Sequence, residues 1–396
     1  MRKNDLSKDR QKRLVPVEAY SGAYALVPPD VPIKRGFSGV DRTKLVQAEE
    51  SLDLLETLAT RLPNPDLITR TADRREAVRS SQIEGTRSDM DDLLTYEATG
   101  SNEGMPLDVL VTKNYVTALE TGLKEVRLIG SRAINMDLIK MIHARLMAGV
   151  DYNGTPGTFR DQQNWIGGGG NIYAARFVPP PHDRLDKCMR NLEGLLQYAV
   201  SEENQMVSSI VVRMAVAHAQ FESIHPFIDG NGRVGRILLP LMLAAEGYPP
   251  TYLAGFLKGN QREYYDALLD VQLKGNWARW INFFSVGVDA AAKESIRTGV
   301  ELEKVLESWK QAVAGMGLRS DSVIHKLPEF LIGTPVVSAH QTKDELKISF
   351  PSASAALGRI EEIGILVRAK QQLRNRVFVA REVIDILNRP TGVDHG

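Results

Sequence analysis

Residues 224–236 place a titratable base, a carboxylate, an amide and two arginines within one short run, IHPFIDGNGRVGR. His225 has an ordinary imidazole pKa of about 6.5, so it can act as a general base near neutral pH. Asp229 supplies a hard carboxylate oxygen suited to Mg²⁺ that is shared with phosphate groups. These residue types predict chemistry on a phosphorylated ligand.

The second half of this run has the features of an anion site. Gly230 and Gly232 can adopt positive φ angles and let backbone N–H groups form a nest for phosphate oxygens. The helix expected after them adds the partial positive charge of its N-terminus. Arg233 and Arg236 are three residues apart, so both lie near one face of its first turn and can clamp phosphates.

Two apolar segments at helical spacing, 206–218 and 237–245, surround the run and predict two buried helices joined by a loop. His218, His225 and Asp229 could suggest a zinc site, but no metal-binding spacing of His or Cys is present. We therefore expect His218 to be a core residue.

The whole run is similar to the signature of the Fic family, His-Pro-Phe-x-(Asp/Glu)-Gly-Asn-Gly-Arg-x-x-Arg, at every specified position. The resemblance implies a protein adenylyltransferase that moves AMP from ATP to a Ser, Thr or Tyr hydroxyl of a target protein, with Mg²⁺ or Mn²⁺. It implies that the catalytic residues are His225, Asn231 and Arg233. It implies a nucleotide-binding set made of Glu84, Phe227, Asp229, Gly230, Asn231, Gly232, Arg233, Val234, Gly235, Arg236 and Tyr265.

The resemblance also implies a role for each group. His225 would deprotonate the target hydroxyl, and Asp229 would hold the metal at the α and β phosphates. Asn231 and the glycine nest would stabilise charge on the transferred phosphoryl group. Arg233 and Arg236 would hold the departing pyrophosphate.

A second motif precedes the first. Residues 72–84 predict a helix that ends at Gly85 and carries the sequence SSQIEG. Ser80 and Glu84 are four residues apart and share a helix face. SSQIEG resembles the Fic inhibitory motif, (Ser/Thr)-x-x-x-Glu-(Gly/Asn), which implies that Glu84 pairs with Arg236. The alternative is an ordinary solvated glutamate.

Two short β-prone segments, 164–167 and 172–178, lie on either side of a glycine run and predict a hairpin. The resemblance implies that the hairpin over 164–178 is a flap that aligns a target protein by strand pairing. An ordinary surface hairpin is the alternative. The resemblance also puts Tyr265 in the nucleotide pocket, whereas Gln272 replaces an Asn that many relatives carry.

Composition sets limits on these functions. Lys plus Arg and Asp plus Glu both number 49, so the net charge of zero gives no general bias toward nucleic acid. Cys188 is the only cysteine and is expected to be a buried thiol; a reducing, cytoplasmic compartment is therefore expected. No apolar run reaches the roughly 18 residues of a membrane-spanning helix.

The predicted fold is mainly α, with a Fic helical core, a β-hairpin flap, an N-terminal helical segment and a C-terminal winged-helix domain. We expect three domains: residues 1–105 with the N-terminal arm and the inhibitory motif, 106–300 with the catalytic site, and 301–396. The last is predicted from helices at 322–332, from Val336 onward and at 352–363, followed by strands at 364–367 and 376–379.

Alternatives remain open. The C-terminal region could bind DNA through its third helix, but that helix has few basic residues, and a protein-docking module is favoured. The chain could remove AMP, use another phosphate donor, or be a winged-helix DNA-binding regulator with a nucleotide-sensing domain. A homodimer is also possible.

Overall fold

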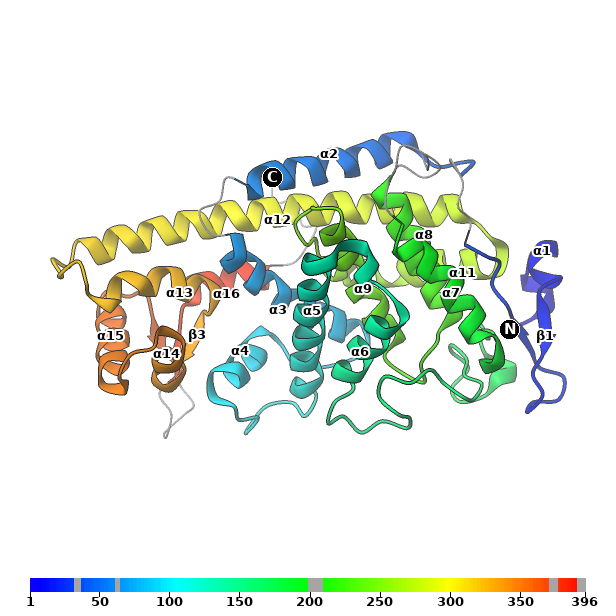
Figure 1. Cartoon of the computed structure of the whole chain (residues 1–396), viewed down its shortest axis with the longest axis horizontal. Helices are drawn as coiled ribbons and strands as arrows, with labels where there is room; N and C mark the ends of the chain where they lie inside the picture. The colour runs from blue at the N-terminus through cyan, green and yellow to red at the C-terminus, as the bar shows by residue number, and fades with distance from the viewer. Residues whose placement is uncertain (32–36, 61–64, 199–208, 370–376, 390–396) are drawn as a thin grey trace. The chain divides into compact units, whose positions relative to one another are not determined.

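The computed structural model describes residues 1–31, 37–60, 65–198, 209–369 and 377–389 (Figure 1). It is mainly α-helical with small sheets, which confirms the predicted fold class. The chain forms two compact units: residues 1–56 with 117–292, and residues 57–116 with 293–396. No helix among the described residues is long and apolar enough to cross a membrane.

The first unit holds the run with the candidate chemistry. Its elements, in chain order, are η1 (Lys3–Asp5), α1 (Lys8–Gln11), β1 (Leu14–Pro16), β2 (Tyr24–Leu26), most of α2 (Arg42–Ala59), most of α5 (Val109–Ile129), η2 (Gly130–Ala133), α6 (Met136–Leu146), η3 (Ile172–Ala174), η4 (His182–Arg184), α7 (Leu185–Leu196), α8 (Ile210–Ile224), α9 (Asn231–Ala245), α10 (Ala254–Gly259), α11 (Gln261–Lys274) and the start of α12 (Trp277–Ala314).

Helix α8 is the centre of this unit, because every one of its residues is buried. The Ser209 side chain caps its first turn by accepting a hydrogen bond from the Val212 N–H. Helices α7, α9 and α11 pack around it. The Trp280 indole N–H donates to the carbonyl of Ala215 on α8 at 2.7 Å. The polar group of this buried tryptophan thus has a hydrogen-bond partner inside the core.

The flap region differs from the predicted hairpin. A single antiparallel bridge joins Ile166 to Phe177, and residues 172–174 form the 3-10 turn η3 instead of a strand. The physical reason is Asn171, whose side chain accepts the Tyr173 N–H at 3.0 Å and starts a turn. The prediction of a β-strand over 172–178 is therefore wrong, although the two segments do meet.

The N-terminal arm covers the flap region. Strands β1 and β2 pair antiparallel, and the Leu26 N–H donates to the carbonyl of Val178 at 2.9 Å. Val17 and Ala25 pack with Ile172 and Val178 in one buried apolar cluster. The arm and the flap region therefore share a small core.

The second unit contains the SSQIEG helix and the C-terminal region together. Its elements are α3 (Pro65–Ile83), α4 (Met90–Thr99), the start of α5, most of α12, η5 (Val323–Lys326), α13 (Leu327–Gly333), β3 (Val336–Ser338), α14 (Ala339–Leu346), α15 (Phe350–Glu362), β4 (Val367–Arg368), β5 (Val377–Val379) and α16 (Arg381–Asn388).

The C-terminal elements follow the predicted order of three helices and a hairpin, with one correction. The predicted helix from Val336 begins with strand β3 instead, and α14 starts only at Ala339. Two β-branched valines favour the strand, which pairs with β5 in a sheet of order β3-β5-β4. Ser338 then caps α14 by accepting the Gln341 N–H. The winged-helix assignment remains a prediction.

Helix α3 is tied to the C-terminal region. It packs against α13 and α16, and the Arg79 guanidinium donates to the carbonyl of Asn388 at 3.3 Å. On α4, which follows α3, the carbonyl of Ala98 accepts a hydrogen bond from the Ser338 hydroxyl at 2.8 Å. Residues distant in sequence therefore fix the helix that carries the SSQIEG sequence.

Gly235 explains how closely α9 approaches α8. A Cβ atom at this position would lie 2.9 Å from Glu222 Oε1, 3.1 Å from Phe221 Cδ1 and 3.3 Å from His218 Cε1. All three neighbours are buried side chains of α8, which have little space to move. The glycine in the signature run is thus required for helix packing.

We predict that Gly235→Ala destabilises the protein by about 1–3 kcal/mol through overpacking. The matched control is Gly194→Ala on α7, where an added Cβ meets nothing within 4 Å. That change should stabilise by about 0.5–1 kcal/mol, because alanine favours helix more than glycine does. Thermal melting of both variants tests the packing, and equal melting temperatures would contradict it.

Candidate active site

His225 ends helix α8 in a left-handed conformation, with φ 49° and ψ 61°. Its N–H donates to the carbonyl of Phe221 at 2.9 Å, as in a helix C-cap. His225 and Lys347 are the non-glycine residues with positive φ in the described part of the chain. Such a conformation is uncommon for a side chain of this size and requires support from its surroundings.

Arg160 supplies that support. Its Nε donates to the carbonyl of His225 at 2.9 Å, and its backbone N–H donates to the carbonyl of Pro226 at 2.9 Å. Its Nη2 donates to the carbonyl of Pro180, just after the flap region, at 2.5 Å. Burial lowers the pKa of Arg160 to about 10, so the group stays a cation at neutral pH. Arg160 therefore joins the His225 loop to the base of the flap.

The His225 imidazole faces two amide side chains. Its Nδ1 lies 2.9 Å from Asn164 Nδ2 and 3.1 Å from Asn231 Nδ2. Burial, and to a lesser degree the Arg160 cation, lowers the pKa of His225 to about 3. The ring is therefore neutral throughout the physiological range, which is the form that a general base requires.

Asn231 holds the loop closed from the start of α9. Its Oδ1 accepts the Phe227 N–H at 2.9 Å, and its Nδ2 donates to the Phe227 carbonyl at 2.8 Å. The residue is buried. We expected Asn231 to stabilise charge on a phosphoryl group, whereas its side chain is engaged with the backbone of the loop and with His225.

Phe227 anchors the loop in the core. It is fully buried and stacks on His143 of α6 with ring centroids 3.8 Å apart. The Gly157 N–H donates to His143 Nδ1 at 2.8 Å, so the ring proton lies on Nε2, which donates to the carbonyl of Asp229 at 3.1 Å. Burial lowers the pKa of His143 to about 4. His143 is therefore a neutral structural support of the loop.

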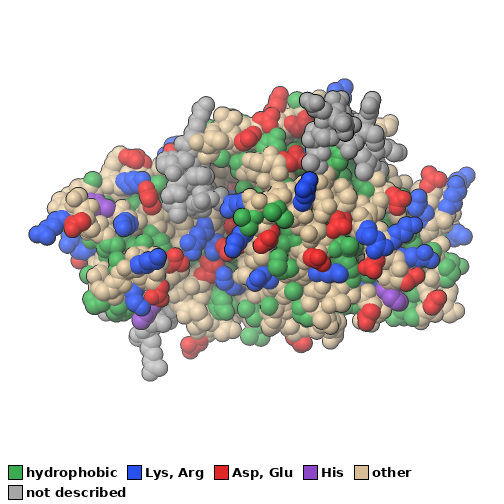
Figure 2. Space-filling view, viewed as in Figure 1, with side chains coloured by type: hydrophobic (Ala, Val, Ile, Leu, Met, Phe, Trp, Pro, Cys, Tyr) green, Lys and Arg blue, Asp and Glu red, His purple; other side chains and the backbone are tan. Residues whose placement is uncertain are grey.

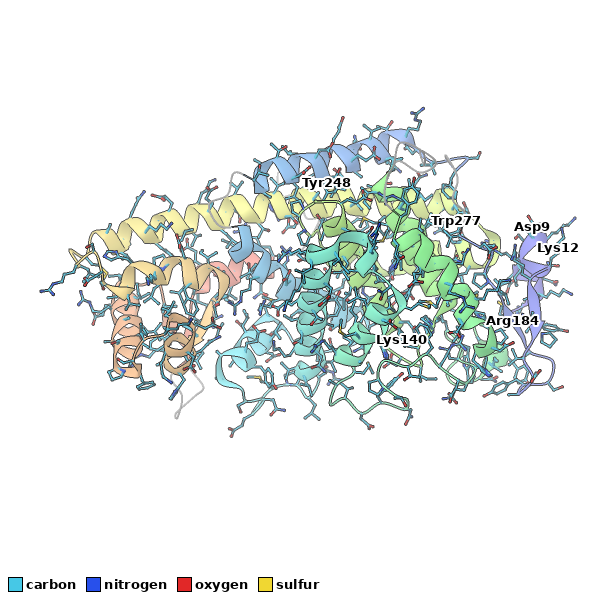
Figure 3. All side chains as sticks on the ribbon, in the orientation of Figure 1. Asp9, Lys12, Lys140, Arg184, Tyr248 and Trp277 are labelled. Carbon is cyan, nitrogen blue, oxygen red and sulfur yellow. The ribbon has the colours of Figure 1, made fainter. Side chains whose placement is uncertain are left out.

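A second aromatic contact continues this anchor. Phe159 packs against Phe227 at 5.3 Å, and the Lys140 ammonium lies 4.7 Å from the centre of the Phe159 ring. Lys140 projects from α6 (Figure 3). The Lys140 cation thus contacts one end of a row of three aromatic rings, Phe159, Phe227 and His143.

The anion site is predicted at the N-terminus of α9. Gly230 is its N-cap with φ 81° and ψ 1°, and no side chain caps this end. The positive end of the helix dipole therefore lies at Gly230 and Asn231, next to Asp229. Gly232 lies inside the first helical turn, so the prediction that it adopts a positive φ is wrong.

The charged groups of the run lie around this helix end. Asp229 is mostly exposed, and its Oδ1 accepts the Gly230 N–H at 2.6 Å. Its Oδ2 lies 3.4 Å from Nη2 of Arg233, whose side chain is buried. Arg236 is also buried, as are Val234 and the packed Gly235. The guanidinium of Arg233 and the carboxylate of Asp229 thus meet at a helix end that no side chain caps.

A metal ion held by protein groups alone does not fit here. No group of three His, Cys, Asp or Glu side chains that could hold a metal occurs among the residues described. The exposed carboxylate of Asp229 beside an anion site fits a different arrangement, in which Mg²⁺ takes most of its ligands from phosphates and water.

The two neighbouring tyrosines of α11, Tyr264 and Tyr265, differ in burial. Tyr264 is buried, and its hydroxyl lies 2.9 Å from Nε2 of His218, which is a core residue as expected. Tyr265 is 37% exposed. Gln272 is buried and donates to the carbonyl of Glu222 at 3.4 Å. Gln272 is thus engaged with the end of α8.

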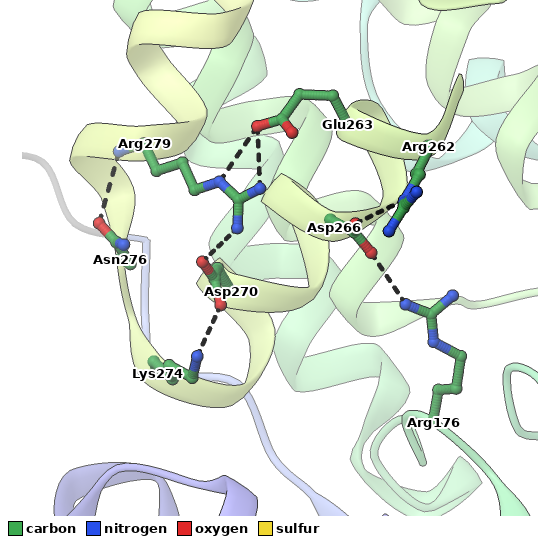
Figure 4. A network of polar contacts seen from close by, with 8 residues as sticks. All are labelled: Arg176, Arg262, Glu263, Asp266, Asp270, Lys274, Asn276 and Arg279. Carbon is green, nitrogen blue, oxygen red and sulfur yellow. Dashed lines mark hydrogen bonds and ion pairs between the residues drawn. The ribbon is translucent and has the colours of Figure 1, made fainter. Parts of the chain in front are cut away.

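Figure 4 shows a charged network along the same helix. Arg279 pairs with Glu263 and Asp270, and Arg176 of the flap region pairs with Asp266 at 3.1 Å. Apart from Asp270, these side chains are at least a third exposed, so the pairs contribute little to stability. The Arg176 pair places the end of the flap region beside the helix that carries Tyr265.

The SSQIEG sequence, predicted to be inhibitory, lies at the end of α3 in the second unit. Ser80 is buried, whereas Glu84 is exposed after the last helical residue, Ile83. The Glu84 N–H donates to the carbonyl of Ser81 at 3.0 Å, and Gly85 follows with φ 94°. Arg236 belongs to the other unit, so the Glu84–Arg236 pair remains a prediction.

Two residues of the site escaped sequence analysis: Arg160 and Asn164. Both precede His225 by more than 60 residues and contact it through hydrogen bonds. Neither belongs to a spaced motif, so no pattern in the sequence indicates them. The available signal was their position, Arg160 just before the predicted flap and Asn164 at its first residue.

Solved structures show where this fold occurs. Fic-1 from C. elegans aligns with a TM-score of 0.51 and 21% identity, over 65% of this chain and 72% of that chain. A Fic domain containing signaling protein from Bacteroides thetaiotaomicron aligns with a TM-score of 0.50 and 18% identity, over 65% and 96%. At these identities the likeness shows the fold alone.

Curated relatives carry the same name in several animals. A protein adenylyltransferase Fic from Culex quinquefasciatus is 33% identical over 150 residues, which cover 38% of this chain and 26% of that protein. Protein adenylyltransferase fic-1 from Caenorhabditis elegans is 30% identical over 135 residues, covering 34% and 23%. The aligned region thus spans about a quarter of the length of these relatives.

Two family models match adjacent parts of the chain. Residues 42–124 match the Fic/DOC family N-terminal model, and residues 133–243 match the Fic/DOC family model. The second match contains the uncapped start of α9 and the His225 loop, and the first contains the SSQIEG motif. The chain therefore belongs to the Fic/DOC family.

Proposed function

We propose that this protein transfers AMP from ATP to a Ser, Thr or Tyr hydroxyl of a target protein. The observation that carries the proposal is a neutral His225 imidazole four residues before Asp229, with the uncapped N-terminus of α9 next in the chain. A base and an anion site in one loop suit transfer of a phosphoryl-linked group to a hydroxyl. The names of the curated relatives support the same reaction.

The transfer conserves atoms and charge. The target hydroxyl loses its proton to His225, and its oxygen forms a bond to the α-phosphorus of ATP while the bond to pyrophosphate breaks. The N–H groups at the start of α9 stabilise the negative charge that develops on the phosphate oxygens. Arg233 and Arg236 neutralise the departing pyrophosphate. Positioning and electrostatics supply most of the rate enhancement.

Asp229 is the residue that would hold Mg²⁺ or Mn²⁺. When bound, the metal would neutralise charge on the phosphates. Because Arg233 also contacts this carboxylate, we expect the pair to separate when Arg233 turns toward pyrophosphate.

We further propose that Glu84 inhibits this transfer by pairing with Arg236. The support is the SSQIEG motif at the end of α3 and the exposed position of Glu84. An arginine held by a carboxylate cannot bind the γ-phosphate, so ATP would bind with its α-phosphate turned away from attack.

The C-terminal region is more consistent with docking a protein than with binding DNA. On α15, Arg359 pairs with Glu362, and Arg368 of strand β4 pairs with Glu361. Figure 2 shows Lys and Arg interspersed with Asp and Glu on the visible face. Such mixed charge gives little of the counterion release that dominates DNA binding.

We predict that His225→Asn lowers AMP transfer at least about 100-fold, because a positioned base contributes roughly 10²–10⁴ in rate. Asparagine tolerates the left-handed backbone better than alanine, so the fold should persist. His182→Ala, which removes an exposed imidazole, is the control and should keep full activity. Labelled ATP measures transfer, and comparable rates in His225→Asn would contradict the base assignment.

We predict that Asp229→Asn raises the Mg²⁺ concentration for half-maximal transfer at least about tenfold, as loss of a metal ligand or its support does. The amide can still accept the Gly230 N–H, so the loop should be retained. Asp151→Asn changes an exposed carboxylate elsewhere in the first unit and serves as the control. An unchanged metal requirement in Asp229→Asn would show that Asp229 does not hold the ion.

We predict that Glu84→Gly raises self-modification with labelled ATP by at least about tenfold, since a pair worth about 1.4–3 kcal/mol reduces the competent fraction by ten- to a hundredfold. Glu103→Gly removes another exposed carboxylate of the second unit and should leave the rate unchanged. Adding His225→Asn to Glu84→Gly should abolish the gain. Equal rates for wild type and Glu84→Gly would identify Glu84 as an ordinary surface residue.

A further inference from the structure

We propose that Arg160 is a positioning residue for AMP transfer, because it holds the main chain of His225 in the left-handed conformation from which the imidazole acts. The inference rests on the proposed role of His225 as the base. Arg160 acts through the backbone of His225 and the ends of the flap region, and not on the reacting atoms.

Two requirements meet at position 225. Helix α8 ends there in the left-handed region, with φ 49° and ψ 61°, where glycine is the usual residue. The proposed chemistry needs an imidazole at the same position, so glycine cannot serve. Pro226 adds a further constraint, since the residue before a proline favours extended conformations. The left-handed form of His225 must therefore be held by contacts from other segments.

Hydrogen bonds fix the peptide groups on both sides of the His225 Cα atom. On the N-terminal side, the His225 N–H donates to the carbonyl of Phe221 at 2.9 Å. On the C-terminal side, the His225 carbonyl accepts a hydrogen bond from Nε of Arg160 at 2.9 Å. The next carbonyl, that of Pro226, accepts the Arg160 backbone N–H at 2.9 Å. Arg160 thus sets the orientation of the peptide groups that follow His225.

The Arg160 guanidinium is buried and has no carboxylate partner among the described residues. Its acceptors are three main-chain carbonyls: those of His225, of Gln162 at 3.0 Å and of Pro180 at 2.5 Å. A buried cation without an opposite charge is costly, so this side chain does not serve as an ion pair. The three carbonyls instead use its planar fork of donors, which lysine lacks.

Two of these carbonyls lie at the ends of the flap region. Gln162 stands two residues before the first flap residue, Asn164, and Pro180 stands two residues after the last, Val178. One guanidinium therefore joins the proposed base to both ends of the segment predicted to align the target. Loss of this junction would shift the imidazole relative to the target hydroxyl, and a misplacement of about 1 Å can lower a rate about 100-fold.

ATP binding should depend much less on Arg160. Its hydrogen bonds reach the His225 loop and the flap ends, whereas the arginines expected to bind phosphates, Arg233 and Arg236, lie on α9. A positioning role therefore predicts a lower kcat with little change in the KM for ATP. General destabilisation would instead lower the fraction of the protein that binds ATP.

The kinetic test compares Arg160→Lys, which keeps the charge and loses the fork, with Arg160→Gln, which removes the buried charge. Rates with labelled ATP are expressed per molecule that binds a non-hydrolysable ATP analogue, so unfolded protein is not counted. Both variants should lower kcat at least about tenfold and change the KM for ATP less than about twofold.

Arg10→Lys is the matched control. Arg10 is also buried, burial also lowers its pKa to about 10, and it donates to a main-chain carbonyl, that of Val271 on α11, at 3.1 Å. This variant loses the same kind of fork away from the His225 loop and should keep the wild-type kcat.

Crystal structures of the variants without nucleotide give a readout that is independent of activity. His225 should leave the region of positive φ in Arg160→Lys and Arg160→Gln, and should keep it in Arg10→Lys. If one Arg160 variant does not fold, the other carries both measurements. An unchanged His225 φ in a folded Arg160 variant, or a wild-type kcat, would overturn the proposal. If the wild type transfers no AMP, the proposed function fails, whereas the structures still decide whether Arg160 positions His225.

Discussion

The left-handed turn at His225 is the constraint on which the rest of the site depends. It ends α8 at Ile224, turns the chain through Phe227, and allows α9 to begin at Asn231. Without the hydrogen bonds that Arg160 donates to this turn, a histidine would have little reason to remain at positive φ. The buried cation therefore stabilises a backbone shape, and that shape presents the imidazole beside the start of α9.

Burial alone does not distinguish a catalytic histidine in this protein. His143 and His225 both have a pKa lowered by burial, so both rings are neutral at physiological pH. Their partners differ, since both nitrogens of His143 are engaged with Gly157 and Asp229. The described contacts of the His225 ring use Nδ1. The nitrogen that remains makes His225 the better candidate for proton transfer.

The parts of the site whose causes are local could be predicted from the sequence. The helix–loop–helix over 206–245 follows from apolar spacing and glycines within one short segment. Predictions failed where a single contact changed the backbone: Asn171 begins a turn in a β-prone segment, and Val336 forms a strand because β5 lies beside it. Gly232 became helical because α9 begins at Asn231.

Arg160 and Asn164 were beyond reach for a different reason. Their hydrogen bonds to His225 join positions more than 60 residues apart, and no spacing rule encodes such contacts. Contacts between residues distant in sequence also determine the structure of the second unit. Helix α3 lies early in the chain, yet Asn388 and the C-terminal helix α13 contribute to its surroundings. The position of Glu84 at the end of α3 therefore depends on residues some 300 positions later, and the stability of that unit limits how firmly the carboxylate is held.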